Sequence, residues 1–185
     1  MSEVLWRRLN YFLSPQLDIY RSIGPRMKGL SVLEVGFGTG TGTLQLVPRA
    51  RNVTAIEVDI EAVEFARSAY PNQADWQKGS ILDYRIESRY EAVVMIEVLE
   101  HIKDWRRAID NIYASLVPGG KLFMSARNAN ADLRKNELHE REWTGQEFRS
   151  SLLEYFQNVT LWDYTLKNEQ NNTTRMTPLV AEATK

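Results

Sequence analysis

The sequence predicts an α/β fold in which a mostly parallel β-sheet carries helices on both faces. Two stretches favour this class. In residues 30–47 an apolar, β-rich run enters a glycine-dense loop and an apolar pattern then resumes, as expected for a strand, a tight turn and a helix. Residues 90–96 form the most apolar run of the chain, which is typical of a central parallel strand buried on both faces.

Length and composition limit the class of protein. At 185 residues the chain is long enough for one domain with a full core and too short for two, so we expect a single domain over residues 1–185. A hydrophobic content of 43% with 25% charged residues indicates a soluble globular protein. The formal net charge of -1 provides no overall basic field for nucleic acid. Because cysteine is absent, disulfides, thiolate metal sites and a cysteine nucleophile are excluded.

The N-terminal residues predict helices rather than a targeting segment. Apolar side chains in residues 3–13 share one helical face, and Ser14-Pro15 opens a second short helix. We expect residues 1–28 to form a helical cap and residues 29–185 to form the core. No apolar run approaches a membrane span and no secretory signal is evident, so we expect no membrane partner and a cytoplasmic location.

The loop after the first strand carries glycine at alternate positions: Gly36, Gly38, Gly40 and Gly42. Glycine allows the sharp turn off a parallel strand and leaves the backbone open to a ligand. The dinucleotide fingerprint G-x-G-x-x-G needs a further glycine at Thr41 or Thr43, which the chain lacks. A nicotinamide cofactor is therefore disfavoured.

An acid follows at the distance that nucleotide-binding folds require. Residues 52–57 predict a second strand that ends in Glu57, about 21 residues beyond Gly36, where a carboxylate accepts hydrogen bonds from ribose hydroxyls. We expect Asp59 to cap the helix that follows, over residues 61–69. The sequence thus favours an adenosine-containing ligand.

The second half of the chain completes the pattern. Residues 76–83 predict a third strand running into a loop, and residues 104–116 a helix ended by Pro118-Gly119-Gly120 before a strand at 121–125. The long polar stretch 127–142 is a candidate active-site loop. Thr144 and Glu147 predict a capping box for a helix whose apolar face is Phe148, Leu152, Leu153 and Phe156. Residues 159–166 and 176–183 predict a hairpin with a short polar turn.

These motifs resemble a known family. Glu34, Gly36, Gly38 and Gly40 after an apolar strand resemble the first motif of class I S-adenosylmethionine-dependent methyltransferases. The combination of Leu99-Glu100-His101-Ile102, a helix, Pro118-Gly119-Gly120 and an apolar strand resembles the middle of the small type 11/12-like members. The resemblance implies a Rossmann-like fold: a seven-stranded, mostly parallel sheet with an antiparallel last strand and helices on both faces.

The resemblance also implies S-adenosyl-L-methionine as the cofactor. The loop would pass beneath its methionine portion and Glu57 would hold its ribose. Ser80 and Ile81 would contact its adenine, although the family commonly has an acid where this chain has Ser80; an ordinary connecting loop is the alternative. The expected cofactor-binding residues are Glu34, Gly36, Gly38, Gly40, Glu57, Ser80, Ile81 and Ile96.

A second concentration of ionisable residues follows the central strand. Glu97, Glu100 and His101 have the spacing that brings three side chains to one face of a helical turn, and His139 is the other of only two histidines. Together they make a candidate site for Mg²⁺ or Mn²⁺. The set resembles the metal ligands of methyltransferases that act on the terminal 2′-hydroxyl of small RNAs, and similar sets occur in O-methyltransferases of ubiquinone synthesis.

Other roles for these residues stay open. Without a metal, His101 is the candidate catalytic base, because imidazole titrates near neutral pH. Structurally, His101 would bond a backbone carbonyl, Glu97 would hold the amino group of the cofactor, and His139 would be a loop residue. Trp105, Trp143 and Trp162 are expected in packing rather than against a substrate.

We therefore expect methyl transfer from S-adenosylmethionine to the hydroxyl of a small-molecule or sugar-like acceptor. One alternative is metal-dependent 2′-O-methylation of an RNA 3′ terminus, which the near-neutral charge disfavours. Another is a non-catalytic subunit that binds S-adenosylmethionine. A nitrogen or carbon acceptor stays open as well, and nothing in the sequence indicates an oligomeric state.

Overall fold

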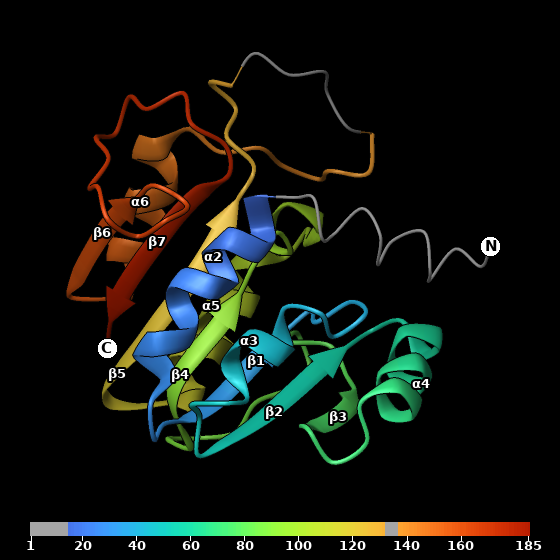
Figure 1. The fold of residues 1–185 in the computed structure, drawn as a ribbon. Coiled ribbons are helices and arrows are strands. Elements are labelled where there is room, and N and C mark those ends of the chain that lie inside the picture. Colours follow the sequence, from blue (N-terminus) through green and yellow to red (C-terminus); the bar gives the residue numbers. More distant parts are fainter. Residues whose placement is uncertain (1–14, 132–136) are drawn as a thin grey trace.

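The computed structural model describes residues 15–131 and 137–185, and within them a seven-stranded sheet has the order β3-β2-β1-β4-β5-β7-β6 (Figure 1). Strand β7 is antiparallel to both β5 and β6, whereas the pairs from β3 to β5 are parallel. The predicted fold is therefore confirmed. The strands are β1 (Ser31–Val35), β2 (Asn52–Glu57), β3 (Asp75–Lys78), β4 (Tyr90–Met95), β5 (Leu116–Ala126), β6 (Asn158–Trp162) and β7 (Leu179–Thr184).

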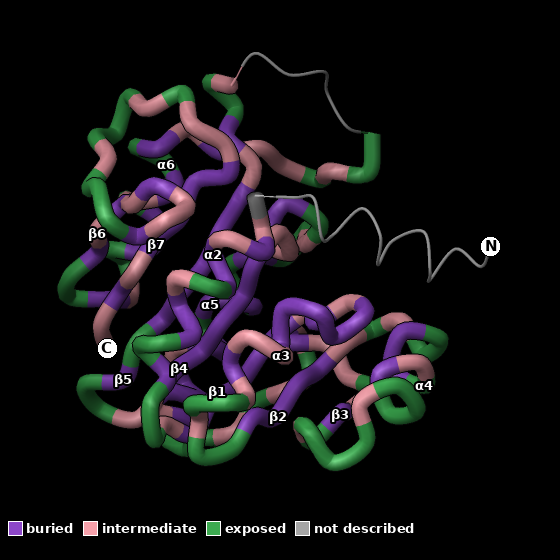
Figure 2. The backbone as a smooth tube through the Cα atoms, in the orientation of Figure 1, coloured by how far each residue is buried: buried purple, intermediate pink, exposed green. Residues whose placement is uncertain are grey.

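Helices cover both faces of the sheet, because alternate residues of each central strand point to opposite sides. On one side Val32, Val94 and Phe123 pack with residues of α2, η1 and α3. On the other side Leu33, Val93 and Leu122 pack with α5 and α6. The helices are α2 (Pro15–Ile23), η1 (Gly24–Met27), α3 (Thr43–Leu46), α4 (Ile60–Ala69), η2 (Leu99–His101), α5 (Trp105–Ser115) and α6 (Gly145–Leu153). Figure 2 shows the central strands as the most continuously buried part of the chain.

Two predicted helix starts are confirmed in detail. The Asp59 side chain caps α4 by accepting a hydrogen bond from the Glu61 backbone N–H. Thr144 Oγ1 accepts from the Glu147 N–H at 3.1 Å, and the Glu147 carboxylate accepts from the Thr144 N–H at 2.9 Å. This capping box begins α6. Local side-chain chemistry therefore sets these boundaries.

Three local expectations are wrong. Strand β5 begins at Leu116, because Gly119, with φ of 77°, lets Pro118-Gly119-Gly120 form an irregularity within the strand before pairing resumes at Lys121. Leu153 is 40% exposed and does not belong to the buried face of α6. The connection between β6 and β7 spans residues 163–178 instead of a short turn. The helix predicted over residues 3–13 lies outside the described residues.

Helix α2 is held to the sheet by a buried polar contact as well as by apolar packing. The Tyr20 hydroxyl donates a hydrogen bond of 2.7 Å to Glu34 Oε1, in the middle of β1. Glu34 is fully buried, and this burial raises the pKa of its carboxyl from 4.5 to about 7, against the opposing effect of hydrogen bonds. In the described part of the chain, no helix is long and apolar enough to cross a membrane.

The raised pKa of the Glu34 carboxyl predicts that the free energy of unfolding depends on pH. The variant Glu34→Gln, which cannot ionise at this position, should lack this contribution. Between pH 4.5 and 7 the folded protein retains a proton that the unfolded chain has lost, so the stability of the wild type falls as pH rises and then levels off. Relative to Glu34→Gln, the wild type should lose at most about 3 kcal/mol across this window, since one pKa unit corresponds to ~1.4 kcal/mol. Urea unfolding of both proteins at pH 5 and pH 8 measures the difference. A constant difference would contradict the prediction.

Candidate functional site

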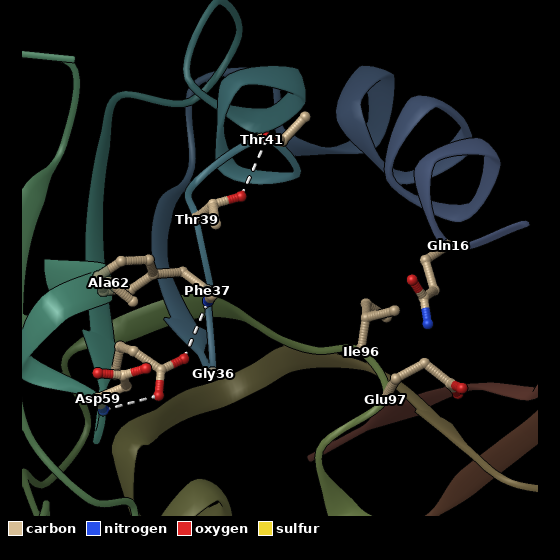
Figure 3. A pocket seen from close by; sticks show the side chains of 11 residues that line it. Gln16, Gly36, Phe37, Thr39, Thr41, Asp59, Ala62, Ile96 and Glu97 are labelled. Carbon is tan, nitrogen blue, oxygen red and sulfur yellow. Dashed lines mark hydrogen bonds between the residues drawn. The ribbon is translucent and has the colours of Figure 1, made fainter. Parts of the chain in front are cut away.

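Two adjoining cavities lie where β1, β2 and β4 end. The smaller one, of about 230 Å³, lies against the glycine-rich loop and is called the loop cavity (Figure 3). The larger one, of about 810 Å³, extends toward η2 and is called the wide cavity. Gly36, Glu57 and Glu97 line both. Their position matches the rule that ligands of open α/β sheets bind outside the carboxyl ends of the strands.

Gly36 and Gly38 are required for different reasons. Gly36 has φ of 74°, and a Cβ on it would lie 2.3 Å from Val98 Cγ2, so its glycine identity allows the loop to pack against the segment after β4. A Cβ on Gly38 would meet nothing within 4 Å, although its φ is 55°. Gly38 therefore leaves the backbone open on the side of the loop cavity that it lines.

The Glu57 carboxylate is fixed at the junction of the two cavities. Its Oε2 accepts a hydrogen bond from the Gly38 N–H at 2.9 Å, and its Oε1 accepts from the N–H groups of Val58 and Asp59 at 2.7 and 3.1 Å. A carboxylate offers roughly four acceptor positions. Three backbone donors thus hold it in place and leave capacity for a hydroxyl of a ligand.

The wide cavity has an apolar slot beside Glu57. Val58 lines it although its side chain is 65% exposed, and Ile81, Leu82 and Ile102 line it as well. Ser80 Oγ, also on the wall, accepts a hydrogen bond from the Leu82 N–H at 3.2 Å. An apolar slot with a few polar groups suits a flat aromatic base.

Glu34 and Gly40 do not line either cavity, whereas the other predicted cofactor residues do. Ile96 lies in the loop cavity, and Ser80 and Ile81 lie in the wide cavity. The Glu34 carboxyl is buried and accepts a hydrogen bond from Tyr20, so its contact is with α2 and it stabilises the end of β1 from which the glycine-rich loop begins. A Cβ on Gly40 would lie 2.9 Å from the Trp76 ring, so this glycine serves packing.

Both histidines lie in one group with Glu100. One ligand atom from each of Glu100, His101 and His139 lies within 4.8 Å of the others. The two imidazole rings meet edge to face with centroids 4.9 Å apart. His101 Nδ1 lies 3.0 Å from the Leu138 carbonyl oxygen, and His139 Nδ1 lies 3.3 Å from Glu142 Oε1. Since both partners are acceptors, each Nδ1 carries a proton and each Nε2 is the basic or ligating atom.

Glu97 does not belong to this group, so the expected common helical face is wrong. The η2 turn begins only at Leu99, and Glu97 precedes it with φ of 56°. Ser125 Oγ accepts from the Glu97 N–H at 2.8 Å and donates to Glu97 Oε1 at 2.9 Å. The Glu97 side chain therefore lies toward the loop cavity, which it lines with Gln16.

Burial is the largest influence on the pKa of the Glu97 and Glu100 carboxyls. Burial raises the pKa of the Glu97 carboxyl, while Ser125, Gln16 and the charges of Arg127 and His101 lower it. Burial and then the neighbouring Glu97 raise the pKa of the Glu100 carboxyl, against hydrogen bonds from the backbone N–H groups of Glu100 and Arg127. A cation bound beside either acid would favour its charged form.

Sequence reasoning missed Gln16 and Ser125, whereas Arg127 begins the stretch predicted as an active-site loop. Ser125 stands at the end of β5, so the rule on strand ends could have identified it. Gln16 had no such signal. Trp105 and Trp143 pack edge to face at 4.8 Å in the buried core, as expected.

Comparison with known proteins identifies the family. A family model described as a methyltransferase domain matches residues 5–168. A probable S-adenosylmethionine-dependent methyltransferase of Mycolicibacterium smegmatis is 28% identical over 149 residues, which are 77% of this chain and 58% of the relative. A ubiquinone biosynthesis O-methyltransferase of Coxiella burnetii is 32% identical over 113 residues, which are 56% of this chain and 46% of the relative. The chain thus spans about half the length of these relatives.

A solved structure has the same fold. The N-methyltransferase NodS from Bradyrhizobium japonicum WM9, in complex with S-adenosyl-L-homocysteine, superposes with a TM-score of 0.68 over 91% of this chain and 84% of that one, at 22% identity. This likeness agrees with the sheet order and with the glycine-rich loop after β1. Because the family model covers most of the sequence, the chain belongs to the methyltransferase domain family, with the fold of the class I S-adenosylmethionine-dependent methyltransferases.

Proposed function

We propose that this chain binds S-adenosylmethionine across the loop cavity and the wide cavity and transfers its methyl group to an oxygen of a small-molecule acceptor. The observation that carries the proposal is the Glu57 carboxylate, which backbone donors hold at the junction of a glycine-lined cavity and an apolar slot. A nucleoside joined to a short polar chain matches this combination of surfaces.

The residues present fit this cofactor. Glu57 would accept from the ribose hydroxyls, and Ser80 and Ile81 would contact the adenine in the slot. Gly36 and Gly38 would lie beneath the methionine portion. When bound, S-adenosylmethionine supplies an electrophilic methyl group. The contribution of the protein is then to align an acceptor, exclude water and remove the acceptor proton.

His101 is the proposed general base. Its ring lines the wide cavity, and its Nδ1 is held by the Leu138 carbonyl, so Nε2 can accept a proton from a hydroxyl. The resemblance to the O-methyltransferase of ubiquinone synthesis supports an oxygen acceptor. The net charge of -1 supports a small molecule over RNA.

A second candidate for the same group is a divalent-ion site at Glu100, His101 and His139. Three observations support it: the mutual proximity of their ligand atoms, the acceptors that orient both Nδ1 atoms, and a buried Glu100 Oε2 without a hydrogen-bond partner among the described residues. Mg²⁺ or Mn²⁺ there would lower the pKa of a coordinated hydroxyl. His101 would then be a ligand and not the base.

Cofactor binding is tested with a pair of glycine variants. Gly36→Ala should weaken the binding of S-adenosylhomocysteine at least about tenfold, because the added methyl group collides with Val98 beside both cavities. Gly29→Ala is the matched control, since Gly29 also has positive φ, of 75°, but lines neither cavity. Isothermal titration calorimetry measures both. Absence of binding to the wild type would refute the proposed function.

Catalysis is tested by transfer of a labelled methyl group to a panel of acceptors: catechols, sugars, amines and a short RNA duplex. His101→Ala should reduce kcat about 10²-fold or more for an oxygen acceptor, while the affinity for S-adenosylhomocysteine stays unchanged. Transfer only to amines would contradict the oxygen acceptor, and transfer only to RNA would favour the terminal 2′-O reaction. Cofactor binding without turnover on any acceptor would favour the non-catalytic alternative.

The metal site is tested by titrating Mn²⁺ with detection by electron paramagnetic resonance. Binding to the wild type should be lost in His139→Ala and retained in Glu97→Gln, because Glu97 lies outside the group. Loss in Glu97→Gln would show that the site is built differently. Failure of the wild type to bind Mn²⁺ would leave His101 as the base.

A further inference from the structure

Arg127 follows β5 directly, at the edge of the sheet where the cavities open, and its guanidinium has few partners. The side chain is 22% exposed. Its Nε is buried and has no hydrogen-bond partner among the described residues. The ion pair from this Nε to Glu142 Oε1 spans 3.8 Å, which is too long for a hydrogen bond. Because a guanidinium carries five N–H donors in a planar fork, Arg127 retains donors for a ligand.

Backbone hydrogen bonds connect Arg127 to the η2 turn. The Arg127 carbonyl oxygen accepts from the Trp143 N–H at 3.0 Å, so the segment 139–143 lies beside the end of β5 (Figure 1). The start of the same segment is bonded to η2, because the Glu140 N–H donates to the Glu100 carbonyl oxygen at 2.8 Å. The end of β5, the segment 139–143 and η2 therefore form one continuous wall.

Side chains on this wall form a row from His101 to Arg127. The rings of His101 and His139 meet with centroids 4.9 Å apart. His139 Nδ1 lies 3.3 Å from Glu142 Oε1, and the same oxygen lies 3.8 Å from Arg127 Nε. His101 lines the wide cavity, whereas Arg127 lines neither cavity. The row therefore leads out of the wide cavity and ends at a guanidinium.

The acids near Arg127 do not use its donors. Ser125 Oγ donates to the Glu97 carboxyl at 2.9 Å, and Glu142 accepts from a histidine. Glu100 is 1% exposed. Burial raises the pKa of the Glu97 and Glu100 carboxyls, and the charge of Arg127 lowers it, so Arg127 acts on both through its charge. A partly buried donor group without hydrogen bonds requires an explanation, and a bound anion supplies one.

A carboxylate is the anion that suits this position. A guanidinium binds a carboxylate or a phosphate through two parallel hydrogen bonds. A phosphate monoester carries a charge of about −1.5 to −2 at pH 7, so Glu142 would repel it more strongly than a carboxylate with a single charge. The neighbourhood of Arg127 therefore favours the carboxylate.

We propose that Arg127 binds a carboxylate of the methyl acceptor, so that the acceptor is a small hydroxylated carboxylic acid. This inference rests on the proposed function, which places the reacting hydroxyl at His101. The acceptor then extends from the wide cavity along the row, with its hydroxyl at one end and its carboxylate at the other. Arg127 determines specificity and positions the acceptor, and it takes no part in the removal of the proton.

The test compares two probes that differ in charge, 3,4-dihydroxybenzoate and 3,4-dihydroxybenzamide, on protein saturated with S-adenosylhomocysteine. Isothermal titration should show that the benzoate binds about tenfold more tightly or better, because the neutral amide cannot form the charge-assisted pair. Arg127→Met, which keeps an unbranched stem, should remove this difference. Arg127→Lys should retain part of it, since it keeps the charge and loses the fork.

Arg141→Met is the matched control. Arg141 belongs to the same segment, but its guanidinium lies over the Trp143 ring, 3.9 Å from the centroid. This variant should keep the wild-type ratio of the two affinities. The affinity for S-adenosylhomocysteine reports whether each variant is folded, and it should stay unchanged because Arg127 lines neither cavity.

The outcomes separate the two claims. Equal affinity of the wild type for both probes, binding of neither probe, or an unchanged ratio in Arg127→Met would overturn the inference and leave the proposed function standing. A wild type that does not bind S-adenosylhomocysteine would overturn the proposed function, and the inference with it.

Discussion

The turn at Gly36 is the constraint on which the site depends. Its N–H still pairs with the Ile56 carbonyl oxygen, as if β1 continued, yet its φ of 74° turns the chain out of the sheet. The Val98 side chain occupies the place where a Cβ would project. One residue thus joins the ends of β1, β2 and β4, and both cavities open at this junction. A side chain there would separate the loop from the segment that carries Glu97.

Three acids surround this junction, and burial raises the pKa of each. Their partners differ, and so do their tasks. Glu34 lies behind the loop and holds Tyr20, Glu97 lies between Gln16 and Ser125, and Glu100 lies with the histidines. Glu97 and Glu100, three apart in the sequence, thus have different partners although their carboxyls are electrostatic neighbours. Glu97 precedes the η2 turn and has a positive φ, so the two residues do not share the helical turn that the spacing predicts.

Local sequence was sufficient wherever a short-range contact decides the structure. The cap at Asp59, the capping box at Thr144 and the central buried strand follow from side-chain chemistry and apolar patterning within a few residues. The distance of Glu57 from Gly36 also singled out this residue, which lines both cavities, and its role as a ribose ligand stays a prediction. Local residue patterns could not predict contacts between distant segments. Neither the pair Tyr20 and Glu34 nor the pair Gln16 and Glu97 is indicated by the residues around either member.

The sequence by itself determined the fold class, the glycine-rich loop, the acid at the end of β2 and the concentration of ionisable residues after β4. These features depend on periodicity, turn chemistry and spacing along one segment. Only the tertiary structure decided which of the acids line a cavity and which lie behind it, that Glu100 and not Glu97 groups with the two histidines, and that α2 reaches the loop cavity. The physical reason is that orientation at strand ends depends on long-range packing and backbone conformation, and both are set by the whole sheet rather than by neighbours in the chain.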